Sequence, residues 1–312
     1  MMKRKGMWAT LLVAGVSSLM YMATGKFPDA VATYEEKVKD YASAPEEGRA
    51  EEPGRTGRAD EGSSTASDAT GRHRKLELPA TARGELVLTH LAYTVSFNTH
   101  HNNPNWVAWE LTAREAEGTG RRSNDFRPDP LLDERQQVTT EDYKGSGYDR
   151  GHMCPAADNK WDARAMTECF YMSNMCPQLH ELNAGGWETL EAACRRWAKQ
   201  EGSLLIVCGP VYDLEVKARQ GQRSTRRMKS IGKEHRIDVP TGFFKCVMSL
   251  RKGHEKAIGF YYANTDARQT MESACMSVDE VESLTGYDFF VNVPSDLEER
   301  LEAECSRYFL SL

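Results

Sequence analysis

The segment Asp149-Arg150-Gly151-His152 constrains the fold of this chain most, because it puts two charges and an imidazole into one turn-rich stretch. Gly151 allows close backbone approach just before His152. The run Cys169-Phe170-Tyr171-Met172 is short, aromatic and apolar, which predicts a second, buried strand. A stripe with helical period follows, made of Asn183, Trp187, Leu190, Glu191 and Cys194. We therefore predict strand, strand and helix, with His152 on the first strand and Asn183 opening the helix.

The polar groups in this arrangement suit one kind of chemistry. An imidazole accepts a proton near neutral pH, a guanidinium neutralises an anionic oxygen, and an amide oxygen is a ligand for a hard metal ion. Asn174 adds a second polar cluster before the helix, on which Asn183 and Glu191 lie about two turns apart. These are the groups that hydrolysis of a phosphodiester with one metal ion requires.

Further blocks occur in a fixed order along the chain. They are Ser173-Asn174-Met175-Cys176-Pro177-Gln178, Asn183-x-x-x-Trp187-x-x-Leu190-Glu191, Val207-Cys208-Gly209-Pro210-Val211-Tyr212, Val239-Pro240-Thr241-Gly242-Phe243-Phe244-Lys245 and Thr285-Gly286-Tyr287-Asp288-Phe289-Phe290. With them, the chain resembles the DNA/RNA non-specific endonucleases that carry a ββα-metal finger. The resemblance implies an α+β fold, in which helices flank a central, mainly antiparallel sheet.

The resemblance also implies roles for three residues of the finger. His152 is expected to act as the general base on the attacking water. Asn183 is expected to bind Mg²⁺, for which Mn²⁺ is a possible substitute, although an asparagine before a helix is also a common N-cap. Glu191 is expected to hold metal-bound water.

Five further polar residues are expected to contact the substrate or to support the site. Arg150 suits a phosphate oxygen, or else it pairs with Asp149. Arg122 is expected to be a second phosphate ligand, with Arg121 as the alternative. Asn174 is expected to bind substrate. Asp149 and Asp158 are expected to fix their loop by hydrogen bonds.

The rest of the C-terminal part mixes strands and helices without a regular βαβ repeat, which predicts the α+β class. Expected strands are Leu86-Val87-Leu88, residues 92–97, residues 106–111, residues 204–208 and residues 243–248. Expected helices are residues 279–285 and 295–308.

The N-terminus combines Lys3-Arg4-Lys5 with a largely apolar run from Met7 to Thr24. This pattern is typical of a signal peptide or an uncleaved signal anchor, which we expect in residues 1–33. The protein is then exported to a periplasmic or extracellular location, and it contacts the membrane if the segment stays uncleaved. Residues 34–75 have almost no large apolar side chains and predict a flexible linker before an endonuclease domain at 76–312.

All eight cysteines lie between Cys154 and Cys305. In an exported chain, an even number of cysteines predicts disulfides. Cys154 and Cys176 are one candidate pair, across the two strands of the finger. Cys208 and Cys246 are a second pair, or simply core residues.

The net charge of −6 is unusual for a protein that binds polyanions, but basic residues gather in one stretch. They are Lys217, Arg219, Arg223, Arg226, Arg227, Lys229, Lys233 and Arg236. We expect this stretch, with Arg226 and Arg227, to follow the phosphate backbone of DNA and RNA. The alternative is a solvated surface loop.

Two other functions fit parts of the pattern. One is an exported nucleic-acid-binding protein with a decayed nuclease site. The other is a zinc-stabilised binding domain that uses His152, Cys154, Cys176 and His180.

Overall fold

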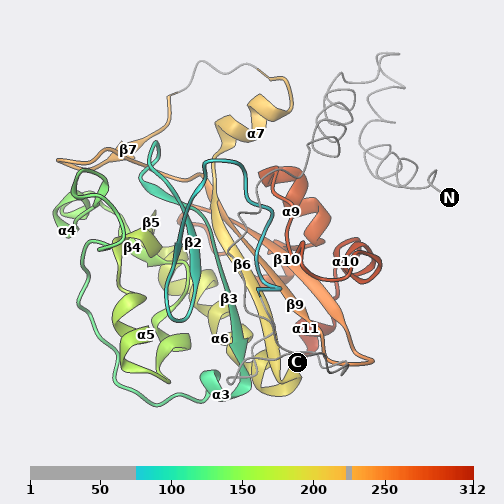
Figure 1. Ribbon diagram of the computed structural model, residues 1–312. Helices are drawn as coiled ribbons and strands as arrows, with labels where there is room; N and C mark the ends of the chain where they lie inside the picture. Colours follow the sequence, from blue (N-terminus) through green and yellow to red (C-terminus); the bar gives the residue numbers. More distant parts are fainter. Residues whose placement is uncertain (1–74, 223–226) are drawn as a thin grey trace, which may run out of the picture. The chain divides into compact units, whose positions relative to one another are not determined.

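The structure, a computed structural model, describes residues 75–222 and 227–312 (Figure 1). Residues 75–216 and 227–312 belong to one compact unit, the larger one. Residues 217–222, which end helix α7 (Asp213–Arg219) and turn at Gly221, are assigned to a second unit. The expected signal segment and nearly all of the expected linker lie outside the described residues. Among the helices of the described ranges, none is both long and apolar enough to cross a membrane.

A seven-stranded antiparallel sheet forms the centre of the larger unit. In spatial order its strands are β1 (Leu86–Thr89), β2 (Thr94–Asn98), β3 (Asn103–Thr112), β6 (Ser203–Val211), β9 (Gly242–Ser249), β10 (Lys256–Ala263) and β11 (Cys275–Met276). This confirms the α+β class and the antiparallel sheet. Every strand expected from the sequence outside the finger is present, while β10 and β11 were not expected.

Both faces of the sheet are buried, because successive side chains of a strand point to opposite sides. On β3, Val107 and Trp109 belong to one apolar cluster, and Trp106 and Ala108 belong to the other. Helix α6 (Glu188–Glu201) packs in the first cluster. Helices α9 (Val278–Thr285) and α10 (Ser295–Glu302) pack in the second, on the opposite side of the sheet (Figure 1).

The expected strand–strand–helix finger lies on the α6 face. Strand β4 (Asp149–His152) pairs antiparallel with β5 (Met175–Gln178), and the π-helical turn η4 (Leu182–Trp187) then leads into α6. The second strand was expected at residues 169–172, and that position is wrong. Those residues end helix α5 (Ala163–Glu168), form a single bridge from Tyr171 to Arg127 and enter the turn η3 (Met172–Asn174). Their apolar character instead reflects a buried turn, in which Phe170 packs beside His152.

The remaining elements are short. They are α3 (Ala113–Ala116), η1 (Glu134–Gln136), α4 (Thr140–Tyr143), η2 (Ala156–Asn159), β7 (Ser230–Ile231), β8 (Ile237–Asp238), α8 (Met271–Ala274) and α11 (Tyr308–Ser311). The helix expected over residues 295–308 ends at Glu302. It ends early because the following backbone turns to β10, where the Ser306 N–H donates to the Ala257 carbonyl at 3.0 Å.

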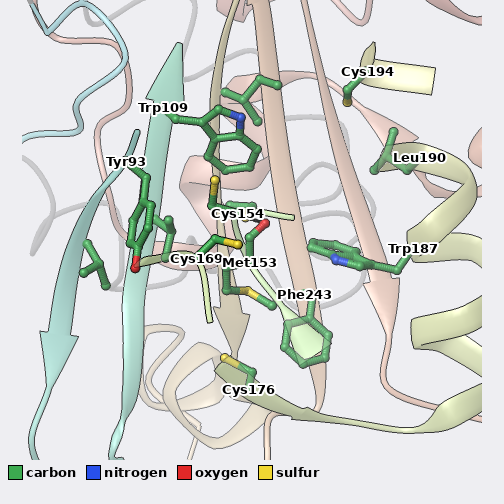
Figure 2. Close-up of a cluster of buried hydrophobic side chains, with 14 of the residues drawn as sticks. Tyr93, Trp109, Met153, Cys154, Cys169, Cys176, Trp187, Leu190, Cys194 and Phe243 are labelled. Atoms are coloured by element: carbon green, nitrogen blue, oxygen red, sulfur yellow. Dashed lines mark hydrogen bonds between the residues drawn. The ribbon is translucent and has the colours of Figure 1, made fainter. Parts of the chain in front are cut away.

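The expected disulfides do not form: all eight cysteines, which lie within the described residues, are free thiols. Cys208 and Cys246 face opposite sides of the sheet, so they cannot bridge. Cys154 and Cys176 share one apolar cluster, but the Met153 side chain lies between them (Figure 2). Burial raises the pKa of both thiols well above the usual value, so they act as neutral core side chains.

Candidate active site

Strand β4 presents its residues alternately to its two sides, with Arg150 and His152 on one side and Asp149 and Gly151 on the other. A Cβ atom at Gly151 would collide with the side chain of Gln178 on the paired strand β5. A larger residue at this position would therefore displace the buried Gln178 side chain. In the register of β4 against β5, Gly151 lies opposite Cys176 and His152 opposite Met175.

The imidazole of His152 is 8% exposed and is enclosed by aromatic rings. Its ring centroid lies 4.8 Å from that of Phe170 and 5.6 Å from that of Phe126. Among the described residues, its Nε2 atom has no hydrogen-bond partner. Burial, followed by the positive charges of Arg122 and Arg150, lowers the pKa of His152 to about 3. The ring is therefore neutral at physiological pH and has a nitrogen available to accept a proton.

Two guanidinium groups lie near this imidazole, each against one of the two aromatic rings that enclose it. Arg150 lies 4.3 Å above the Phe126 ring, and Arg122 lies 5.7 Å from the centre of the Phe170 ring. Both charges act on His152, which favours Arg122 over Arg121 as the second cation of the site. Asp149 pairs with His180 rather than with Arg150, and the buried Nε of Arg150 has no hydrogen-bond partner among the described residues.

Asn183 lies in the wide turn η4, where Gly185 has a non-helical backbone (φ −118°, ψ −106°). Its backbone N–H donates to the Leu179 carbonyl at 2.9 Å, so Asn183 is inside the turn rather than at an N-cap. Its side-chain N–H donates to Asp149 Oδ2 at 2.9 Å, and His180 Nδ1 lies 2.8 Å from the same oxygen. Asp149 thus holds the amide nitrogen of Asn183, which leaves the amide oxygen as the donor for a cation. An amide oxygen beside a carboxylate fits a hard divalent metal ion.

Glu191, on α6, is within the electrostatic influence of a buried lysine that sequence reasoning missed, Lys245. Burial raises the pKa of Glu191 to about 7, although the charge of Lys245 lowers it. Lys245 is 1% exposed, and its Nζ atom lies 4.4 Å from the Trp187 ring centre and 5.2 Å from that of Trp109. The Phe243-Phe244-Lys245 motif was noted in the sequence, but no role was assigned to its lysine.

Asp158 and Asn174 both have structural roles, which were expected for Asp158 but not for Asn174. Asp158 is buried, accepts from Trp109 Nε1 at 3.3 Å and pairs with Arg195 at 3.0 Å, as expected for a residue that fixes the loop. Asn174 was expected to contact substrate, but its side chain is fully buried and bonds only to the backbone of Cys154 and Cys169. Its hydrogen-bonding groups are used to join two segments, so they do not face a substrate.

The basic stretch is only partly described, because Arg223 and Arg226 lie outside the described residues. Arg227 is exposed, and Lys229 Nζ lies 4.8 Å from the ring centre of Tyr148, the residue before β4. Asp142 accepts three backbone N–H groups from residues 233–235 and contacts His235 Nδ1 at 3.0 Å. These bonds anchor the far end of the stretch and hold the pKa of Asp142 well below its usual value, against the effect of burial.

The zinc-stabilised alternative does not fit this geometry. Cys154 and Cys176 are buried neutral thiols on opposite sides of Met153, whereas His180 is exposed and bonds to Asp149. Within the described residues, the groups of side chains close enough to share a metal ion include none of the four expected zinc ligands.

The amino-acid sequence matches the family model described as DNA/RNA non-specific endonuclease over residues 70–296. The chain is 34% identical over 221 residues to "Nuclease 1, mitochondrial" of Schizosaccharomyces pombe, covering 68% of each protein. It is 30% identical over 206 residues to "Endonuclease G, mitochondrial" of Homo sapiens, covering 65% of this chain and 68% of that protein. The fold is similar to a chain in the crystal structure of the EndoG/EndoGI complex, with a TM-score of 0.65 and 27% identity over 75% of this chain and 96% of that chain.

The comparisons overturn the expectation of export. The two relatives described above are mitochondrial nucleases by name. The expectation was based on a basic segment before an apolar run, and N-terminal targeting segments of several kinds share basic residues with an apolar face. Such a pattern therefore does not identify the membrane that a chain crosses.

Proposed function

We propose that this chain, which belongs to the DNA/RNA non-specific endonuclease family of metal-dependent nucleases, hydrolyses phosphodiester bonds in both DNA and RNA. In this proposal, His152 is the general base and Asn183 binds one Mg²⁺. The observation that carries this proposal is the state of His152. The ring is buried and neutral, its Nε2 is unpartnered among the described residues, and two guanidinium groups flank it.

The arginines and the imidazole act together on the substrate. Arg122 and Arg150 bind the non-bridging oxygens of the scissile phosphate by charge-assisted hydrogen bonds. The bound phosphate neutralises the two charges that, after burial, depress the pKa of His152. The imidazole therefore becomes a stronger base when substrate is present, and its Nε2 takes a proton from the attacking water. This coupling links base strength to substrate binding.

The metal-binding part of the proposal rests on oxygen donors near β4. Asp149 fixes the amide nitrogen of Asn183, so the amide oxygen is directed to the cation. Glu191, whose pKa is about 7, accepts hydrogen bonds from water in the site when it is ionised. Bound Mg²⁺, or Mn²⁺ in its place, supplies Lewis-acid stabilisation of the phosphate charge and of the leaving oxygen.

Nucleic acid is expected to bind through its backbone rather than its bases. Arg227 is an exposed cation, and Lys229 contacts the ring of Tyr148, the residue before β4. Contacts of this kind are independent of sequence and make binding salt-dependent. They extend the phosphate-binding surface beyond the scissile group.

The proposal is tested by incubating the purified chain with plasmid DNA and with RNA, in Mg²⁺, in Mn²⁺ and in EDTA. Cleavage of both substrates with metal and none in EDTA is expected. His152→Ala should lower the cleavage rate about 100- to 10,000-fold while leaving nucleic-acid binding in place. His254→Ala, which removes an exposed histidine, is the matched control and should cleave normally. Cleavage by His152→Ala at the normal rate would remove His152 as the base, and cleavage in EDTA would remove the metal.

A further inference from the structure

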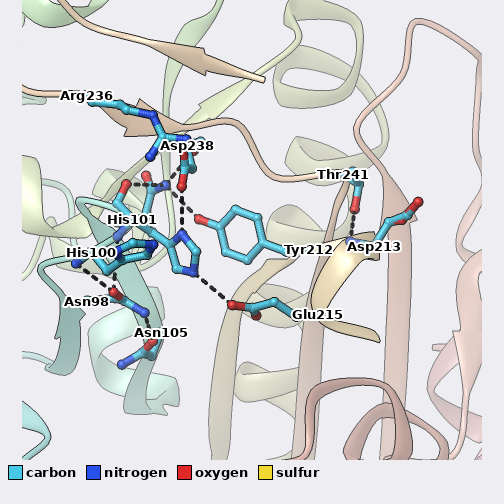
Figure 3. Close-up of polar contacts among 11 residues, drawn as sticks. Asn98, His100, His101, Asn105, Tyr212, Asp213, Glu215, Arg236, Asp238 and Thr241 are labelled. Carbon is cyan, nitrogen blue, oxygen red and sulfur yellow. Dashed lines mark hydrogen bonds and ion pairs between the residues drawn. The ribbon is translucent and has the colours of Figure 1, made fainter. Parts of the chain in front are cut away.

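A second group of metal-ligand side chains lies outside the candidate active site, where the β2–β3 turn meets β8. His100 and His101 belong to the turn, and Asp238 is the last residue of β8. One ligand atom from each of these three side chains lies within 4.8 Å of the other two. Figure 3 shows the two imidazoles next to Asp238, with Glu215 of α7 on the far side of His101.

The two nitrogens of His101 each face a carboxylate. Nδ1 lies 2.9 Å from Asp238 Oδ2, and Nε2 lies 2.8 Å from Glu215 Oε1. The ring also stacks on Tyr212, with the centroids 4.4 Å apart. This arrangement is that of a metal-binding histidine whose outer nitrogen donates to a carboxylate, which fixes the ring orientation and the tautomer.

From these contacts we propose that His100, His101 and Asp238 bind a divalent transition-metal ion of the zinc class, with Glu215 orienting His101. Zinc bonds to nitrogen and oxygen ligands are about 2.0–2.2 Å long, so tetrahedral ligand atoms lie roughly 3.3 Å apart. The contact between His101 Nδ1 and Asp238 Oδ2 needs to lengthen by only a few tenths of an ångström. The ion takes the place of the proton that these two atoms share, and a water molecule completes the tetrahedron.

The turn is held in shape before any ion binds. Asn98 Oδ1 accepts the backbone N–H groups of His100 and His101 at 2.9 and 3.1 Å. The buried side chain of Asn103 donates to the Asp238 carbonyl and to the Tyr212 hydroxyl, both at 2.7 Å. The turn, β8 and Tyr212 are thus fixed to one another, so binding requires little reordering.

The donor set distinguishes this site from the one at Asn183. Two imidazoles and a carboxylate suit zinc, nickel or copper, whereas magnesium prefers oxygen ligands alone. The side chain of Asp238 is fully buried, and its Oδ1 contacts the guanidinium of Arg236 at 2.6 Å. Arg236 is exposed and can turn toward solvent, which leaves Asp238 for the ion. His100 is also exposed and gives the ion access from solution.

The test uses the full chain with Asn183→Ala and His152→Ala, so that metal at the candidate active site does not contribute. Zinc chloride alone is titrated calorimetrically, and cobalt chloride is added for its visible absorption, which is intense only in tetrahedral sites. We expect one equivalent of zinc, a tetrahedral cobalt spectrum, and a higher melting temperature with zinc.

Adding His100→Ala should lower zinc affinity at least about 10-fold and abolish the cobalt spectrum. His100 is at the surface, so this variant should keep its fold, which its melting temperature without metal checks. His254→Ala is the matched control and should bind zinc like its parent. Zinc binding that is unchanged by His100→Ala, or no binding in the parent, would overturn the proposal. This result does not depend on whether the chain cleaves nucleic acid.

Discussion

His152 should make this protein lose stability in mild acid, and His152→Asn should remove that loss. The ring is 8% exposed, and its pKa in the folded protein is about 3, against roughly 6.5 for an unperturbed imidazole. Between these values the unfolded chain binds a proton that the folded protein does not. The contribution of His152 to stability is therefore complete above about pH 6.5 and is lost as the pH falls.

The size of the effect follows from the two pKa values. A full pH unit between them costs about 1.4 kcal/mol, and the unfolded imidazole is half protonated at the upper value. The wild type should therefore lose about 2.3 kcal/mol more than His152→Asn on going from about pH 6.5 to pH 4.5. Urea unfolding at both pH values measures the free energies, and the contributions of the carboxylates, which both proteins share, cancel in the difference. His254→Asn, which changes an exposed histidine, should behave as the wild type. Equal losses in the wild type and in His152→Asn would show that His152 is protonated freely in the folded protein.

Other residues of the site give outcomes that can be measured separately. Asp149→Ala removes the carboxylate that holds the Asn183 amide, so the Mg²⁺ concentration for half-maximal cleavage should rise about 10- to 100-fold; an unchanged magnesium titration would contradict this. Lys229→Ala should reduce the slope of log binding constant against log salt concentration by about one, and an unchanged slope would exclude a phosphate contact at this lysine. Lys245→Met removes the charge that lowers the pKa of Glu191, so the pH profile of cleavage should shift to higher pH. A profile that stays in place while stability falls would separate the lysine from Glu191.

The sequence predicted the elements that local pattern determines. Short runs rich in apolar and aromatic residues identified β2, β3, β6 and β9, because both faces of the sheet are buried. The apolar stripe with helical period after Asn183 identified α6, because one face of this helix is buried against the sheet. The order of the motifs then placed His152 and Asn183 in one finger, and the pairing of β4 with β5 confirms that arrangement.

The errors concern features that only the packed chain determines. Cys169-Phe170-Tyr171-Met172 is as apolar as a buried strand, but it is a turn whose Phe170 packs against His152. Asn174 has an amide that could bind a substrate, yet this amide forms its hydrogen bonds with the backbone of Cys154 and Cys169. The direction in which a thiol points is also not visible in sequence, so Cys208 and Cys246 seemed a possible pair although the sheet separates them. The sequence did indicate both arginines near His152, but not their contacts with Phe126 and Phe170.

The π-helical turn before α6 has a consequence for how this finger can vary. In a regular helix each residue is rotated by about 100° from the one before it. The direction of the Asn183 side chain would then be set by the packing of Trp187 and Leu190, which fixes the orientation of α6 on the sheet. A π turn contains one extra residue, so the direction of the Asn183 side chain is no longer set by the packing of α6. Insertions, deletions or substitutions around Gly185 can therefore change the direction of the Asn183 amide without changing how α6 packs on the sheet.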